Sequence, residues 1–177
     1  MLNGETITVR PVTEADLTRL YERNIDLENR GEFFGLNFRT MSELKRDYAK
    51  HGFWSDEFGM LLICPRGTDE FIGQVVWFPT VRYMDEIEVG YIMWDQSARR
   101  RGAMTEAVKL FTRYLFDTRI LNRIRLCIAS GNIASRRVAE KAGYTHELTQ
   151  RGSDFHRNKR FDMELYAFLR SDLAKAQ

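Results

Sequence analysis

One stretch of the sequence decides the fold: EIEVGYIMWDQSARRRGAMTEAVKLFTRYLFD, residues 86–117. Its first part is rich in β-branched and aromatic residues, and we expect a strand over 86–95. After Asp95 the spacing of apolar residues changes from two to about 3.6, which predicts a helix over 102–117. The apolar face of that helix is formed by Met104, Ala107, Val108, Phe111, Tyr114 and Leu115. A strand followed directly by a helix is the first half of a β-α-β crossover unit.

The regions on either side complete a single mixed α/β domain, residues 1–177. Strands are expected at 6–12, 58–64, 70–80, 123–129 and 160–168, with a short additional strand at 144–149. Helices are expected at 13–26, 42–51 and 132–142, and an irregular or weakly helical connection at 24–40. The strand at 123–129 follows the crossover helix, so it is expected to lie parallel to the strand at 86–95. The rest of the twisted sheet is expected to be mostly antiparallel and flanked by helices.

Composition places the chain among soluble globular proteins. Of its 177 residues, 44% are hydrophobic and 29% are charged, which excludes disordered, collagen-like and low-complexity classes. The net charge of +2 is too balanced to predict a nucleic-acid or membrane partner. No apolar run approaches the roughly 20 residues that span a bilayer, and the N-terminus lacks a secretory signal, so we expect a cytoplasmic protein. Cys64 and Cys127 cannot form a disulfide framework and are expected to be buried free thiols.

The turn at 97–105, SARRRGAMT, is the most informative segment for function. Backbone amides at a helix N-terminus carry the positive end of the helix dipole, and Gly102 lets the backbone approach a ligand closely. Arg99, Arg100 and Arg101 add positive charge beside these amides. The turn is therefore suited to a phosphate or pyrophosphate, and its position between a strand and a crossover helix favours such a ligand. The alternative is a solvated surface turn that happens to be rich in arginine.

Three segments resemble GNAT-superfamily acetyltransferases, in the order and spacing of that family. The run RRRGAM, residues 99–104, resembles the family's pyrophosphate loop, whose pattern is Gln or Arg, two residues, Gly, one residue, then Gly or Ala. Met104 departs from the small residue of the last position. The run EVGYI, residues 88–92, resembles the family's fourth strand, and NIASRRVAEKAGY, residues 132–144, resembles its N-x-x-S…E-K-x-G-[FY] helix. The similarity covers residues 6–170 and is closest to the RimJ/RimL-like branch.

The resemblance implies a GNAT-like fold in which the β-α-β crossover holds acetyl-CoA. The pyrophosphate would accept hydrogen bonds from the amides of residues 101–105, with the arginine side chains extending to the phosphates. The pantetheine arm would pair with the end of the strand at 86–95, with Asn132 on the opposite side. A backbone amide near Ile92 or Met93 would polarise the thioester carbonyl. The expected acetyl-CoA residues are Ile92, Met93, Trp94, Arg99, Arg100, Arg101, Gly102, Ala103, Met104, Thr105, Asn132 and Ser135.

Two residues are candidates for the proton transfers. An aliphatic amine is an ammonium ion at neutral pH, so its attack on a thioester requires a base, and the motif match makes Glu88 the candidate. The alternative for Glu88 is a solvated polar strand face that it shares with Glu86. Many family members place a tyrosine for the leaving thiolate at the position that is Ala139 here, and Ser135 is the RimL-like substitute, with helix capping as its alternative role. No histidine has a second ligand at metal spacing, so no metal site is expected.

The acceptor is expected to bind at two segments. The segment 24–40 places acids beside aromatics, which suits a cationic amine, and its candidate residues are Asp26, Glu28, Phe33 and Phe34. Alternatively, these phenylalanines are core residues and the acids are solvated. The segment 151–159 is basic and would attract an acidic peptide or the adenosine phosphate of CoA. We therefore expect an N-acetyltransferase for a small-molecule amine or a peptide or protein N-terminus, as a monomer or homodimer. A non-catalytic module that binds CoA or phosphates is the alternative.

Overall fold

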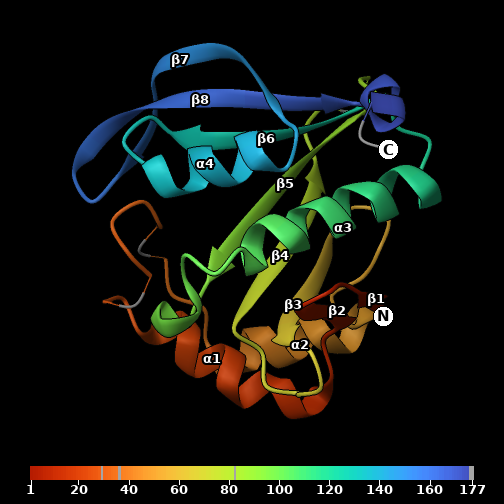
Figure 1. Cartoon of the computed structure of the whole chain (residues 1–177). Helices are drawn as coiled ribbons and strands as arrows, with labels where there is room; N and C mark the ends of the chain where they lie inside the picture. The colour runs from red at the N-terminus through yellow and green to blue at the C-terminus, as the bar shows by residue number, and fades with distance from the viewer. Residues whose placement is uncertain (29, 36, 82, 176–177) are drawn as a thin grey trace.

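The computed structural model of the chain describes residues 1–28, 30–35, 37–81 and 83–175. An eight-stranded sheet has the strand order β1-β2-β3-β4-β5-β6-β8-β7 (Figure 1). Its strands are β1 Leu2–Asn3, β2 Ile7–Pro11, β3 Gly59–Pro65, β4 Gly73–Pro79, β5 Glu86–Met93, β6 Arg123–Ala129, β7 Thr145–His156 and β8 Lys159–Leu169. The α-helices are α1 Leu17–Ile25, α2 Met41–His51, α3 Ala103–Thr118 and α4 Ile133–Lys141. Short 3-10 helices cover Glu14–Asp16, Gln96–Ala98 and Arg170–Lys175.

The crossover predicted from residues 86–117 is confirmed. Strand β5 pairs in parallel with β6 through α3, and the neighbouring strand pairs on both sides are antiparallel. The parallel register ends where Glu88 faces Arg125, although β5 continues to Met93 and β6 continues to Ala129. Beyond this point the two strands diverge (Figure 1). The backbone edge of β5 after Glu88 is therefore not paired with β6.

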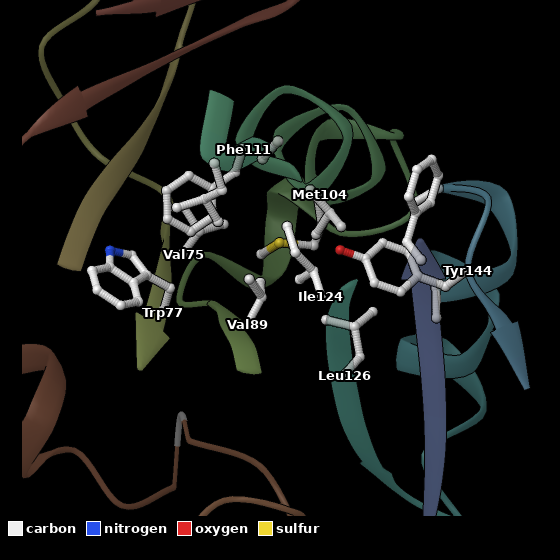
Figure 2. Close-up of a cluster of buried hydrophobic side chains, with 14 of the residues drawn as sticks. Val75, Trp77, Val89, Met104, Phe111, Ile124, Leu126 and Tyr144 are labelled. Atoms are coloured by element: carbon white, nitrogen blue, oxygen red, sulfur yellow. The ribbon is translucent and has the colours of Figure 1, made fainter. Parts of the chain in front are cut away.

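Helices cover both faces of the sheet. Successive side chains of each strand point to opposite faces, so the strands supply side chains to the core on each face. On one face α3 and α4 pack onto the larger core, which includes Val75, Trp77, Val89, Met104, Phe111, Ile124, Leu126 and Tyr144 (Figure 2). On the other face α1 and α2 pack onto a second cluster that includes Leu17, Leu20, Leu44, Leu62, Ile92 and Trp94. Strand β5 contributes to both cores, Val89 to the first and Ile92 to the second. This alternation decides which side chains of β5 face α4 and which face α1.

Several element boundaries differ from the sequence prediction. Strand β7 extends to His156, whereas only a short strand at 144–149 was expected, because its residues are mostly exposed and have no apolar alternation. Strand β1 was not expected at all. Strand β5 ends at Met93, so Trp94 follows the strand rather than belonging to it.

The cysteines and the membrane prediction can also be compared with the structure. Both Cys64 and Cys127 are free thiols, but only Cys64 is buried, and Cys127 is partly exposed. The difference arises because Cys127 points to the same face of β6 as Arg125, away from the larger core. Within the described ranges, no helix has the length and apolar character needed to cross a membrane.

Candidate active site

The arginine turn connects β5 to α3 with a strained backbone. The carboxylate of Asp95 accepts a hydrogen bond from Ser97 N at 2.8 Å and starts the 3-10 helix before the turn. Gly102 adopts the left-handed conformation with φ +86°. Arg100, which unlike glycine carries a side chain, also adopts it, with φ +64°. That conformation costs an L-residue about 1 to 2 kcal/mol, and such strain is concentrated at functional sites. The side chains of residues 99–101 are all exposed.

The first turn of α3 leaves its backbone amides available and buries Met104, the residue that departs from the pyrophosphate-loop pattern. The first N–H groups of a helix have no partner within it, which applies here to Ala103 and the two residues after it. The Met104 side chain is 8% exposed and points into the core beside Val89 (Figure 2), so it does not cover these amides. Glu106, the acid of this turn, accepts a hydrogen bond from Thr6 N at 3.2 Å. The turn thus combines amide donors with exposed arginines.

The end of β5 directs one amide toward the unpaired edge. Trp94 N donates to Ile72 O at 2.9 Å, and the alternation of an antiparallel ladder then directs the Ile92 N–H toward β4 as well. The same alternation directs the N–H and C=O of Met93 away from β4. In agreement, Arg99 Nη2 donates to Met93 O at 3.2 Å. Of the two amides considered for the thioester carbonyl, that of Met93 faces the open edge, while that of Ile92, like that of Trp94, faces β4.

Glu88 lies at the point where β5 and β6 separate. Its Oε2 accepts a hydrogen bond from Arg125 Nε at 3.0 Å and forms an ion pair with Arg125 Nη2, also at 3.0 Å. The Glu88 side chain is 18% exposed, so the expected alternative of a solvated polar face does not describe it. Burial raises the pKa of Glu88, Arg125 opposes this rise, and the nearby charge of Glu86 adds to it. A carboxyl group with a raised pKa is a better proton acceptor near neutral pH than an ordinary one.

Glu86, on the same strand face, is tied into the fold. Its side chain is 6% exposed, its Oε1 accepts a hydrogen bond from Thr80 Oγ1 at 3.0 Å, and its Oε2 lies 2.8 Å from Arg123 Nε. Arg125 Nη1 is 3.3 Å from Glu86 Oε1, so this arginine joins the two carboxylates. Glu86 is therefore held by Thr80, Arg123 and Arg125, whereas Glu88 pairs with Arg125 at the end of the parallel register.

The start of α4 brings Asn132 and Ser135 opposite β5. Asn132 is the N-cap, and its Oδ1 accepts a hydrogen bond from Ser135 N at 3.1 Å. The Ser135 hydroxyl is 2.8 Å from the hydroxyl of Tyr91, a contact that sequence reasoning missed. One turn further, Ala139 is fully buried and has no hydroxyl. A signal for Tyr91 was available, because a tyrosine among the apolar residues of a strand needs a polar partner for its hydroxyl.

The acceptor segment 24–40 is held together by Arg30, which sequence reasoning also missed. This arginine is 7% exposed, and its Nη1 donates to Gly35 O at 2.7 Å and to Asn37 O at 2.9 Å. Its Nη2 donates to Asn24 O. After α1 ends at Ile25, the described part of the segment is an ordered loop without regular secondary structure, one of the two forms predicted for it.

The four predicted acceptor residues separate in space. Phe33 lies against the start of α4. Its Cζ is 3.2 Å from the position that a Cβ atom on Gly131 would occupy, and its ring centroid is 6.0 Å from that of Phe161. Phe34 is 36% exposed and Phe33 is partly exposed, so neither phenylalanine is a core residue. Asp26 lines a groove of about 360 Å³ along α1, and Glu28 is exposed. Phe33 is thus placed beside the start of α4, and Phe34 lies beside Trp94 at the end of β5, with the ring centroids 6.2 Å apart.

The tip of the β7–β8 hairpin contacts the same loop. Arg157 Nη2 donates to Gly31 O at 3.0 Å, and the His156 ring stacks on Phe161 with the ring centroids 4.2 Å apart. His156 Nδ1 is 3.0 Å from Asp154 Oδ2. Part of the predicted basic segment thus holds the acceptor loop instead of remaining free for a ligand. Among the described residues, no group of three or more His, Cys, Asp or Glu side chains is arranged to hold a metal ion.

Sequence comparison agrees with this geometry. A family model described as "Acetyltransferase (GNAT) domain" matches residues 6–145. The chain belongs to the GNAT family of acetyltransferases. It is 32% identical over 161 residues to the "Probable N-acetyltransferase YjcK" of Bacillus subtilis, and the match covers 83% of this chain and 84% of that relative.

Solved structures share the fold of this GNAT acetyltransferase. The spermidine N-acetyltransferase of Vibrio cholerae, solved with CoA and spermine, superposes with a TM-score of 0.82 at 18% identity, over 95% of this chain and 98% of that one. RimJ of Mycobacterium smegmatis, solved with CoA-disulfide, superposes with a TM-score of 0.75 at 21% identity, over 94% and 83% of the two chains. At these identities the similarity establishes the GNAT fold.

Proposed function

We propose that this GNAT acetyltransferase transfers the acetyl group of acetyl-CoA to a primary amine, which attacks the thioester directly. The observation that carries this proposal is the position of Glu88. It is a largely buried carboxyl group with a raised pKa, and it lies at the last paired residue before β5 and β6 separate. The same strand ends five residues later, at Met93, and the arginine turn at 97–105 then leads into α3.

The residues around the open edge of β5 fit acetyl-CoA. We assign the pyrophosphate to the amides at the start of α3 and the side chains of Arg99, Arg100 and Arg101, because both donor sets carry positive charge. Gly102 gives this turn a left-handed backbone and no side chain that would cover the amides. The pantetheine arm would pair with the unpaired edge of β5, where the Met93 N–H would polarise the thioester carbonyl.

The two candidate residues would act on different parts of the reaction. An ammonium acceptor must lose one proton before its nitrogen attacks and another when the amide forms, and Glu88 would pass these protons to solvent. The new C–N bond forms as the C–S bond breaks, and the electron pair of the C–S bond leaves on sulfur. A hydrogen bond from the Ser135 hydroxyl would stabilise the departing thiolate, which then takes a proton from water.

The acceptor is a primary amine of one of two kinds, a small-molecule amine or a peptide N-terminus. The named neighbours include a spermidine N-acetyltransferase and RimL, a ribosomal L7/L12 alpha-N-protein acetyltransferase solved with coenzyme A. Position 139 is an alanine where many family members have a tyrosine, and Ser135 is the RimL-like substitute for it. This combination supports the RimJ/RimL-like branch. The exposed acids Glu28 and Glu32, which lie in the same segment as Phe34, support a cationic small molecule. The two kinds are distinguished by the acceptor panel below.

Thiol release from acetyl-CoA, measured with a panel of acceptors, tests the proposed function. The panel contains polyamines, amino sugars and short peptides with a free N-terminus, and the same peptides with an acetylated N-terminus are the matched controls. We expect acceptor-dependent release with at least one amine and none with its blocked counterpart. Binding of acetyl-CoA without turnover on any acceptor would instead identify a non-catalytic CoA-binding module.

A further inference from the structure

The hydroxyl of Tyr91 links β5 to the first turn of α4. It is 2.8 Å from Ser135 Oγ and 3.1 Å from Ser135 O. Tyr91 lies on the face of β5 that packs against α3 and α4, and its ring contacts the larger core. The residues are 44 positions apart in the sequence, so the contact is made only by the fold.

The hydrogen atoms of this pair can be arranged in two ways. A carbonyl oxygen only accepts, so in the first arrangement Tyr91 donates to Ser135 O and the Ser135 hydroxyl donates to the Tyr91 oxygen. In the second arrangement Tyr91 donates to Ser135 Oγ, and the Ser135 hydroxyl is free to donate to a ligand. The Ser135 carbonyl stays satisfied in both, because the helix supplies a donor four residues later. The pair can therefore free the Ser135 hydroxyl to donate to a ligand while the Tyr91 hydroxyl and the Ser135 carbonyl keep their hydrogen bonds.

Tyr91 remains a proton donor throughout. Burial raises the pKa of Tyr91 to about 12, against a smaller opposing effect of the hydrogen bond with Ser135. The phenol therefore stays neutral at working pH and keeps its proton. It cannot act as a second base, and its role with Ser135 is to donate.

We propose that Tyr91 is a positioning residue that turns the Ser135 hydroxyl toward the leaving thiolate, an inference that rests on the proposed function. As the C–S bond breaks, its electron pair stays on sulfur, Ser135 donates its hydrogen bond to that sulfur, and Tyr91 donates to Ser135 Oγ. No proton leaves either hydroxyl, and the thiolate is protonated by water after release. Tyr91 thus supplies from β5 the phenol that α4 lacks at Ala139.

The test is a double-mutant cycle of Tyr91→Phe, Ser135→Ala and the double variant, with kcat and the KM for acetyl-CoA measured for each. We expect Tyr91→Phe to lower kcat about tenfold, with KM little changed, because the hydrogen bond that orients the Ser135 hydroxyl toward the sulfur is lost. In the Ser135→Ala background the same change should have no further effect on kcat. Tyr144→Phe is the matched control, since it also removes the hydroxyl of a buried tyrosine, which lies 2.6 Å from Thr112 Oγ1. This control should not change kcat.

A purely structural link between β5 and α4 gives a different result. Tyr91 also contacts the backbone carbonyl of Ser135, and that contact survives Ser135→Ala. A structural role would therefore lower kcat equally in both backgrounds, together with the melting temperature, and this outcome would overturn the proposal. An unchanged kcat in Tyr91→Phe or in Ser135→Ala would overturn it as well. Failure of the proposed function is recognised separately, because the wild-type protein would then acetylate no amine.

Discussion

Replacing Glu88 by glutamine is expected to remove the catalytic base and keep the fold. The glutamine amide has nearly the volume of the carboxylate but cannot accept a proton at neutral pH. Arg125 would lose one charged partner and keep the other, because its Nη1 is 3.3 Å from Glu86 Oε1. Glu86 in turn keeps Arg123 at 2.8 Å. The ion-pair network is therefore reduced without leaving an isolated buried charge.

The effects of Glu88→Gln on rate and on stability differ in size. General-base assistance contributes about 10²- to 10⁴-fold, which corresponds to about 2.7 to 5.4 kcal/mol of activation free energy. The side chains of Glu88 and Arg125 are 18% and 28% exposed, and a partly exposed ion pair of this kind contributes about 1 kcal/mol or less to the free energy of unfolding. If Glu88→Gln lowers kcat more than tenfold, the loss is thus larger than the expected decrease in the free energy of unfolding accounts for.

The assay is the initial rate of thiol release at neutral pH with the best acceptor, together with the Kd for acetyl-CoA and the melting temperature. Glu147→Gln is the matched control, because Glu147 also pairs with an arginine of β6, Arg123, at a distance from the open edge of β5. We expect the control to retain the wild-type rate. A Glu88→Gln variant that binds acetyl-CoA normally and acetylates at the full rate would refute the assignment of the base.

Three further predictions follow from individual contacts. Arg125→Gln removes the positive charge that opposes the raised pKa of Glu88, so the acidic limb of the kcat/KM profile should move to higher pH, whereas Arg125→Lys should leave it nearer the wild type. Asn132→Ala should lower the free energy of unfolding by about 1 kcal/mol in denaturant titration, because the N-cap of α4 is lost, and Asn132→Asp should retain it. Asp16→Asn should cost about 3 to 5 kcal/mol, since it leaves Arg10 buried without its ion-pair partner, both side chains being 10% exposed. Burial opposes the charge of Asp16, but the hydrogen bonds from Arg10 and Thr13 and the charge of Arg10 together outweigh it and hold the Asp16 pKa below its usual range. In the wild-type protein this stabilisation is therefore present above the unfolded pKa of about 3.9 and is lost as the pH falls through the folded pKa, which equilibrium unfolding at acidic pH would measure.

Local patterns were sufficient for the elements whose apolar residues repeat at the right spacing. The helix at 102–117 and the strand at 123–129 agree with α3 and β6 because their buried residues recur with the periods of a helix and a strand. Strand β7 has no such pattern, since its first seven residues are exposed and it is held by pairing with β8. Its full length therefore depends on a non-local hydrogen-bond ladder that residue spacing does not report.

In the candidate site too, local features could be predicted from the sequence and non-local contacts could not. The turn around Gly102 and the N-cap Asn132 were identified from local sequence, because glycine and capping residues have local conformational roles. The partners of the two proton-transfer candidates were not, since Arg125 is 37 residues from Glu88 and Tyr91 is 44 residues from Ser135. These contacts form only when β5 is placed beside β6 and α4.

The most direct test of the account is the ratio of N-acetylated amine to free thiol during turnover. Both products are quantified in one reaction, the amine by mass spectrometry and the thiol by its reaction with a chromogenic disulfide. Direct attack of a primary amine on the thioester predicts one N-acetylated amine for each thiol released. Thiol release without acetylated amine would contradict the account, because the acetyl group would then pass to water or to the protein.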